Sequence, residues 1–185
     1  METLQVGLDS WIVQDGNYGD FHVGQSARFA LEFYPHAVRI TERRIPMCED
    51  TVGSRYRISA KAVFMASGVW VIDFGLRAYK NSTAPQFVSQ GAWIEGEIYV
   101  GIDPFFYSED LHAIPGMPEL RYDFRIKKIV LETTPWLESK NEQGGTILTR
   151  DERHTSFTPV AETKAWEDDG GRAHYVLECE QIHAG

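Results

Sequence analysis

Hydrophobic and polar residues alternate along much of this 185-residue chain with a period of two. The clearest case is residues 26–34, where every second position from Ala27 to Phe33 is apolar. Side chains of a strand point alternately to opposite faces, so this alternation is typical of a strand with one buried face. The pattern therefore predicts a half-buried strand that ends at Pro35, because proline interrupts regular pairing.

Four further segments carry strand signals. Residues 57–64 alternate in the same way, and residues 69–79 are apolar on both faces, which predicts a central strand. Residues 92–102 contain glycines that suit a curled strand. Residues 120–133 form the longest candidate, and their alternation slips at Lys128, as a β-bulge would produce.

The C-terminal part predicts a hairpin. Residues 160–166 and 172–182 flank the segment Glu-Asp-Asp-Gly-Gly, and glycines of this kind allow a turn with positive φ. We therefore expect residues 157–182 to form a hairpin packed on the main sheet. Residues 138–146 are expected to form a polar turn, and no segment carries an apolar stripe over three helical turns.

These signals predict an all-β protein with residues 1–185 in one domain. Antiparallel strands that curl at glycines and hide their edges usually close into a barrel or pack as a sandwich. The strand order resembles that of a partly open OB-type barrel in architecture, although residues 80–90 show no helix before the fourth strand. The expected fold is therefore an antiparallel barrel, OB-like and partly open, or a sandwich.

Composition agrees with a globular domain. Hydrophobic residues make up 43% and charged residues 24% of the chain, and no apolar run approaches the roughly 18 to 20 residues that span a bilayer. The N-terminus lacks a basic patch followed by an apolar run. We therefore expect a cytoplasmic protein with no membrane partner, in which Cys48 and Cys179 are free thiols.

The net charge of −9 is concentrated at the two ends. Residues 1–35 carry five acids against one base, residues 151–185 carry eight against three, and the middle is balanced. An acidic protein repels a phosphate backbone over long range, which lowers the expectation of nucleic-acid binding. The same charge would suit a basic protein partner.

Aromatic residues supply the first candidate site. Phe105, Phe106 and Tyr107 are consecutive in a proline-rich loop, so their side chains cannot all face one core. Exposed aromatic rings anchor partners, and Trp136 and Tyr99 are added to this candidate surface. The alternative is that the loop folds over the end of the barrel and buries two of the three rings.

Charged residues supply a second candidate, a polar pocket. Glu95 and Glu97 lie two apart on one strand face, and paired carboxylates can raise one another's pKa. Asp73 lies in an apolar run with Arg77 four residues away, and His112 is a further acid–base candidate. The alternative is a structural ion pair or a solvated face.

Basic residues supply a third candidate. Arg121, Arg125 and Lys127 project from one face of the longest strand. Beside aromatic rings, such a face on an OB-like barrel would suit a single-stranded nucleic acid. The alternative is that these bases pair with acids on neighbouring strands.

No catalytic motif completes any of these sets. The sequence has no GxSxG elbow, no phosphate-binding glycine loop and no histidine or cysteine pair at metal-ligand spacing. We therefore expect a non-catalytic binding module, without cofactor or metal, that holds a protein partner or small ligand through aromatic-rich loops. Single-stranded nucleic-acid binding and a small-ligand carrier or enzyme with a pocket in the barrel remain as alternatives.

Overall fold

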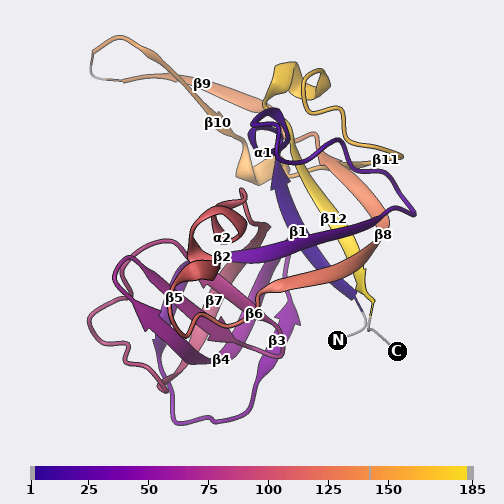
Figure 1. Cartoon of the computed structure of the whole chain (residues 1–185). Coiled ribbons are helices and arrows are strands. Elements are labelled where there is room, and N and C mark those ends of the chain that lie inside the picture. The colour runs from indigo at the N-terminus through magenta and orange to yellow at the C-terminus, as the bar shows by residue number, and fades with distance from the viewer. Residues whose placement is uncertain (1–2, 142, 183–185) are drawn as a thin grey trace.

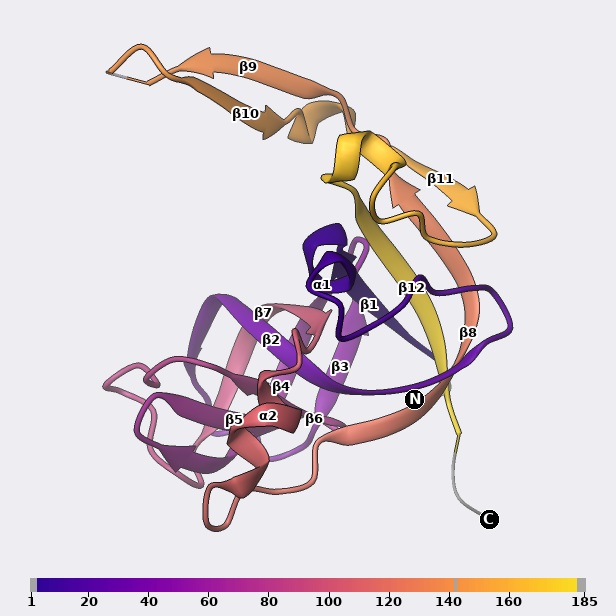
Figure 2. The same cartoon turned by 45° about the horizontal axis from the view of Figure 1, so that its top comes forward.

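The computed structural model describes residues 3–141 and 143–182 and consists mainly of strands (Figures 1 and 2). Most strands belong to a 10-stranded sheet, and the other two form a separate 2-stranded sheet. The all-β prediction is thereby confirmed. The strands are β1 (Thr3–Asp9), β2 (Ser26–Ile40), β3 (Met47–Asp50), β4 (Arg55–Ala66), β5 (Val69–Asp73), β6 (Arg77–Lys80), β7 (Trp93–Ile102), β8 (Arg121–Glu132), β9 (Trp136–Lys140), β10 (Thr146–Arg150), β11 (Phe157–Val160) and β12 (His174–Gln181).

Helical segments are short and lie between the strands. The α-helical turns are α1 (Ser10–Gln14) and α2 (Phe106–Glu109), and the 3-10 turns are η1 (Leu111–Ala113), η2 (Glu152–His154) and η3 (Asp168–Gly171). Short connections of this kind leave the interior to the sheet, as the period of two predicts.

The 10-stranded sheet folds back on itself. Its order is β11-β8-β12-β1-β7-β2-β6-β5-β4-β3, and additional pairings join β8 to β2 and β7 to β4. The pairings form two closed series of strands, in which each strand pairs with the next and the last pairs with the first. We call them circuits: they are β1-β12-β8-β2-β7 and β2-β7-β4-β5-β6, and they share β2 and β7. Two of the strand pairings are parallel: β1 pairs with β7 at Gly7↔Gly101, and β2 pairs with β6 at Glu32↔Tyr79. The sheet is therefore mixed, and the expected antiparallel, OB-like barrel is not confirmed.

β2 can serve both circuits because it is long and is buried on both faces at its centre. Residues 26–30 pair with β8, and residues 31–40 pair with β7. Every residue from Phe29 to Phe33 is buried. The strand does not end at Pro35 as expected. It continues past a bulge between Pro35 and Ala37 that leaves His36 without a pairing partner in β7.

Gly96 of β7 lies opposite the strand segment that follows this bulge. Its φ is +150°, and a Cβ atom there would lie 1.8 Å from the carbonyl oxygen of Ala37. An L side chain is rarely found at such a φ and has no room here. The bulge in β2 therefore depends on glycine at position 96.

A single apolar core runs through both circuits. Phe29, Phe33, Trp70 and Tyr175 are among its fully buried members. A smaller apolar cluster lies under the loop after β7, where Tyr107, Leu111 and Leu120 pack with residues of β4, β5 and β6. The two circuits therefore share one apolar core, and the smaller cluster packs against the outside of β4, β5 and β6.

The expected C-terminal hairpin does not form. β11 and β12 pair with opposite edges of β8 and not with each other. β12 has no free edge for β11, because its other edge pairs along residues 174–180 with β1. Residues 167–171, expected at the hairpin turn, instead belong to the connection that crosses from one edge of β8 to the other.

Two other strand predictions need correction. Residues 69–79 are not one strand but the hairpin β5–β6, which turns at Gly75 with φ +113°. The Asp73 carboxylate accepts a hydrogen bond from the Gly75 amide within this turn. The bulge expected at Lys128 is present one residue earlier, since Lys128 faces Glu178 while Ile126 faces Cys179.

We predict that Gly96→Ala lowers the free energy of unfolding by about 2 to 4 kcal/mol, because it adds backbone strain and a clash with Ala37. Urea unfolding followed by tryptophan fluorescence would measure the loss. Gly19→Ala is the matched control, since a Cβ atom there has no neighbour within 4 Å. Equal urea midpoints for the two variants would contradict the role given to Gly96.

Candidate functional site

The two circuits separate at one edge of β7. This edge pairs with β4 as far as Arg55↔Tyr99 and then with β1 at Gly7↔Gly101. β1 and β4 therefore diverge from the same edge. The buried Tyr56 hydroxyl spans the gap, since it accepts a 2.6 Å hydrogen bond from the Gln5 amide and donates a 2.9 Å one to the Gln5 carbonyl. Backbone groups of β1 that lack a strand partner are satisfied in this way.

Tyr99 fills the point of divergence. A Cβ atom on Gly7 would lie 1.5 Å from the Tyr99 hydroxyl oxygen, so only glycine lets the ring lie on β1. Burial is the main cause of the raised pKa of the Tyr99 hydroxyl. The ring centroid lies 5.9 Å from those of both Tyr34 and His174. The His174 Nδ1 in turn lies 2.8 Å from a carboxylate oxygen of Asp9.

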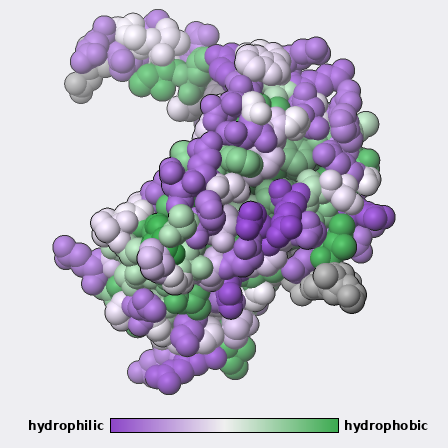
Figure 3. Space-filling view, in the orientation of Figure 1, coloured by the Kyte–Doolittle hydropathy of each residue, from purple (hydrophilic) through white to green (hydrophobic). Residues whose placement is uncertain are grey.

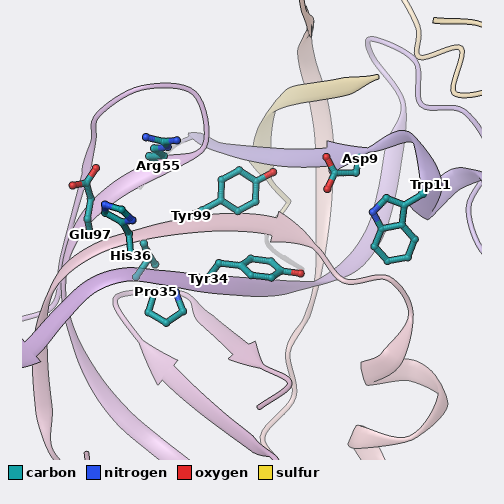
Figure 4. Close-up of a pocket in the computed structure, with 9 residues that line it drawn as sticks. Asp9, Trp11, Tyr34, Pro35, His36, Arg55, Glu97 and Tyr99 are labelled. Carbon is teal, nitrogen blue, oxygen red and sulfur yellow. The ribbon is translucent and has the colours of Figure 1, made fainter. Parts of the chain in front are cut away.

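A hollow of about 460 Å³ opens beside Tyr99 (Figure 4). In this view, Tyr34 and Tyr99 extend towards the end of the hollow that holds Asp9 and Trp11. Trp11 and Tyr34 are 47% and 41% exposed, which is high for large aromatic residues. The lining residues are Asp9, Trp11, Tyr34, Pro35, His36, Arg55, Glu97, Ile98 and Tyr99.

Two further hollows continue this one. The next, of about 470 Å³, shares Arg55 and Tyr99 with the first, and the third, of about 260 Å³, shares Val52, Gly53, Phe157 and Val176 with the second. We call the three together the fork groove. The second is also lined by Ser54, Glu132, Thr134, Arg150, Thr155 and His174, and the third by Gln5, Lys128, Val130 and Glu178.

Three ionisable side chains in the first hollow are free to contact a ligand, whereas that of Asp9 contacts His174. Within the part of the chain that the structure describes, the side chains of His36, Arg55 and Glu97 make no hydrogen bond or ion pair. The bulge in β2 places His36 here, which is how bulges commonly redirect a side chain. The hollow thus offers exposed rings together with unpaired charges of both signs.

An ion pair between buried Glu32 and partly buried Lys80 holds the Tyr34 ring in place. The Tyr34 hydroxyl donates a 2.8 Å hydrogen bond to Glu32, whose other carboxylate oxygen lies 3.1 Å from the Lys80 Nζ. The Lys80 ammonium also lies 3.7 Å from the centre of the Tyr34 ring, a cation–π contact. Burial and the Glu32 charge raise the pKa of the Tyr34 hydroxyl. Tyr34 is therefore exposed on one side and held rigidly on the other.

Asp103 is a second buried carboxylate, at the end of β7. It is fully buried and accepts hydrogen bonds from the Tyr79 hydroxyl and the Tyr107 amide. Burial raises the pKa of Asp103 to about 6, against the opposing effect of these hydrogen bonds. The negative charge of Glu32 adds to the increase.

Of the aromatic candidates, Tyr99 lines the fork groove, and the Trp136 ring lies 3.7 Å from the guanidinium of the lining residue Arg150. The other three lie in the loop after β7. Tyr107 is 2% exposed and its hydroxyl donates to the Pro118 carbonyl, whereas Phe106 is 39% exposed. Phe105 packs edge-on against Tyr18. The Trp136 indole donates to the Asp169 carboxylate. Phe105, Tyr107 and Trp136 thus have partners within the fold. Binding of a partner at these aromatic residues, including the exposed ring of Phe106, stays a prediction.

The polar-pocket candidates have separate partners. Asp73 pairs with Arg77 at 3.1 Å in the β5–β6 turn, and Glu95 pairs with Arg39 at 2.7 Å. The His112 Nδ1 lies 3.1 Å from the Tyr107 carbonyl oxygen. Glu97 is the member of this set that lines the fork groove. An acid–base role for Asp73, Glu95, Glu97 and His112 stays a prediction.

Two of the three basic candidates are paired with acids. Arg121 lies 2.8 Å from Glu119, and Lys127 lies 3.2 Å from Glu180. Arg125 is exposed, with no ion pair among the described residues. The contact between Lys127 on β8 and Glu180 on β12 is the cross-strand pairing expected in the alternative interpretation, whereas Arg121 pairs with an acid two residues away in its own segment. Nucleic-acid binding on this face stays a prediction.

The described residues contain no group of three or more histidine, cysteine, aspartate or glutamate side chains arranged to hold a metal ion. Among the same residues, no helix is long and apolar enough to cross a membrane. Cys48 and Cys179 are both free thiols. Comparison with family models, curated proteins and solved structures gives no match.

We predict a pH-dependent stability that Asp103 controls. A carboxyl whose pKa is raised by folding binds a proton more tightly in the folded chain, so stability falls as the pH rises from about 4 to about 6. The unfolding free energy of the wild type relative to Asp103→Asn should fall over this interval by on the order of 1 to 3 kcal/mol. Urea unfolding of both proteins at several pH values would measure it. A constant difference would contradict the raised pKa.

Proposed function

We propose that this protein is a binding module that holds an extended peptide segment of a partner protein in the fork groove. The observation that carries the proposal is the row of three adjoining hollows along the line where β1 and β4 diverge. The first two hollows are comparable in volume to small-ligand sites and the third is smaller, and three in a row favour an elongated ligand. A peptide in extended conformation has this shape.

The chemistry of the groove changes along its length. The end at Trp11 and Tyr34 offers exposed aromatic rings, whereas Val130, Phe157 and Val176 supply apolar surface at the other end. Arginine and aromatic residues are the types that contribute most to protein binding energy. The middle is polar and carries charges of both signs, so a peptide with two apolar anchors and a polar centre would fit.

The two tyrosine rings that line the first hollow are held in place before a ligand binds. Tyr99 is held on Gly7, and Tyr34 is held by Glu32 and Lys80, so neither ring needs to be ordered when a ligand arrives. Side chains that are already ordered lose less conformational entropy on binding. The proposal keeps the expected non-catalytic module that binds through aromatic residues. It differs in the site, which is the fork groove and not the loop at residues 105–107.

We predict that peptides selected from a random peptide library on the wild-type protein lose affinity for Trp11→Ala and Tyr34→Ala. Removing an exposed ring that contacts the peptide should weaken binding by about 1 to 2 kcal/mol, or roughly 5- to 30-fold. Isothermal titration calorimetry on two or three selected peptides would measure the change. Circular dichroism would confirm that the variants remain folded.

Phe87→Ala provides the matched control, because Phe87 is 54% exposed and lies in the loop between β6 and β7, outside the groove lining. It should bind the selected peptides as the wild type does. If the library yields no binders, or if its binders are unaffected by both groove variants, the proposed function is wrong.

A further inference from the structure

The hairpin β9–β10 projects from the molecule as an arm (Figures 1 and 2). Among the described residues its two strands pair only with each other. Leu137 and Ile147 lie on one face of the arm and are 42% and 43% exposed, and Figure 3 shows apolar surface on the arm. A two-stranded hairpin is marginally stable by itself in water, so an arm with exposed apolar residues calls for a partner.

The hydrogen bonds at its ends fix which backbone groups of the arm are free. The Asn141 amide donates to the Gly145 carbonyl, and the Asp151 amide donates to the Pro135 carbonyl. Hydrogen-bonded and non-hydrogen-bonded pairs alternate along an antiparallel ladder. The pair Glu138↔Leu148 is therefore of the non-hydrogen-bonded kind. The N–H and C=O groups of both residues point outward, away from the other strand.

Three of the four edges in the described sheets carry protection against further pairing. β11 contains Pro159, and β3 has only four residues and ends in Glu49 and Asp50. The outward-pointing positions of β9 include Glu138 and Lys140. Proline, short length and charge are the usual means by which an edge strand avoids association. β10 is different, because its outward positions before Arg150 are Thr146 and Leu148.

We propose that β10 pairs with β10 of a second copy of this chain, so that the two arms form one four-stranded antiparallel sheet. When the two β10 strands pair antiparallel in a register centred on Leu148, the outward-pointing N–H and C=O groups of one strand face those of the other. This register sets Leu148 opposite its own copy and Thr146 opposite Arg150 of the partner subunit, with no like charges opposed. The equivalent register on the β9 edge would oppose two Glu138 carboxylates, which is unfavourable.

The pairing also continues the apolar face of the arm. In this register Ile147 lies opposite Thr149 of the partner subunit, so that both copies of Leu137 and Ile147 share one face of the joined sheet. The contact is small, which places it among weak and transient interfaces. We therefore expect a reversible dimer that forms at concentrations between the low micromolar range and about 0.5 mM.

Analytical ultracentrifugation of the full chain would test this pairing. Wild type should dimerise, and Leu148→Pro should weaken dimerisation at least tenfold, because proline removes an outward N–H without removing a bond between β9 and β10. Glu138→Pro is the matched control, since it removes the outward N–H of the facing residue on the other edge. It should leave the dimer unchanged.

A cross-link gives a second measurement. Residues directly opposite in a hydrogen-bonded antiparallel pair have Cα atoms about 5.5 Å apart, within disulfide range. In a Cys48→Ser background with oxidised glutathione, Leu148→Cys should form a covalent dimer more readily than Thr146→Cys. A monomeric wild type, a dimer insensitive to Leu148→Pro, or a dimer lost in Glu138→Pro would each overturn the proposal.

Discussion

The constraint on which the rest of the structure depends is the exchange of partners along one edge of β7. β4 occupies this edge as far as Tyr99, and β1 takes it over at Gly101. The exchange requires glycine at position 7, because the Tyr99 ring occupies the space that any side chain there would need. Since β2 and β7 serve both circuits, this single edge determines where the two circuits separate and hence where the fork groove opens.

Local patterns predicted the long strands β2, β4, β7 and β8 but not how the strands pair. The alternation in residues 57–64 and 92–102 marks β4 and β7 correctly, because each strand has one face on the core. β1 was missed although Leu4, Val6 and Leu8 alternate with more polar or smaller residues, a readable signal in a short segment. The polar turn expected at residues 138–146 is wrong in its extent, because β9 continues to Lys140 and β10 begins at Thr146. Most residues of both strands are exposed, so no alternation marks them in the sequence.

The groove could not be predicted, because its walls come from strands far apart in the chain. Asp9 and His174 meet only because β1 pairs with β12, and Arg55 reaches Tyr99 only because β4 pairs with β7. One local signal was available at His36. A proline within an alternating segment often marks a bulge, and here the strand continues beyond Pro35 and presents the next side chain to the groove.

The most direct test of the fork groove is amide hydrogen exchange of the full chain with and without a library-selected peptide. The account predicts slower exchange on binding in residues 8–12, 52–56 and 97–101, where the groove walls meet, and no change in the loop at residues 105–113. Slower exchange confined to residues 105–113 or 121–127 would place the binding surface outside the fork groove and rule the groove out as the binding site.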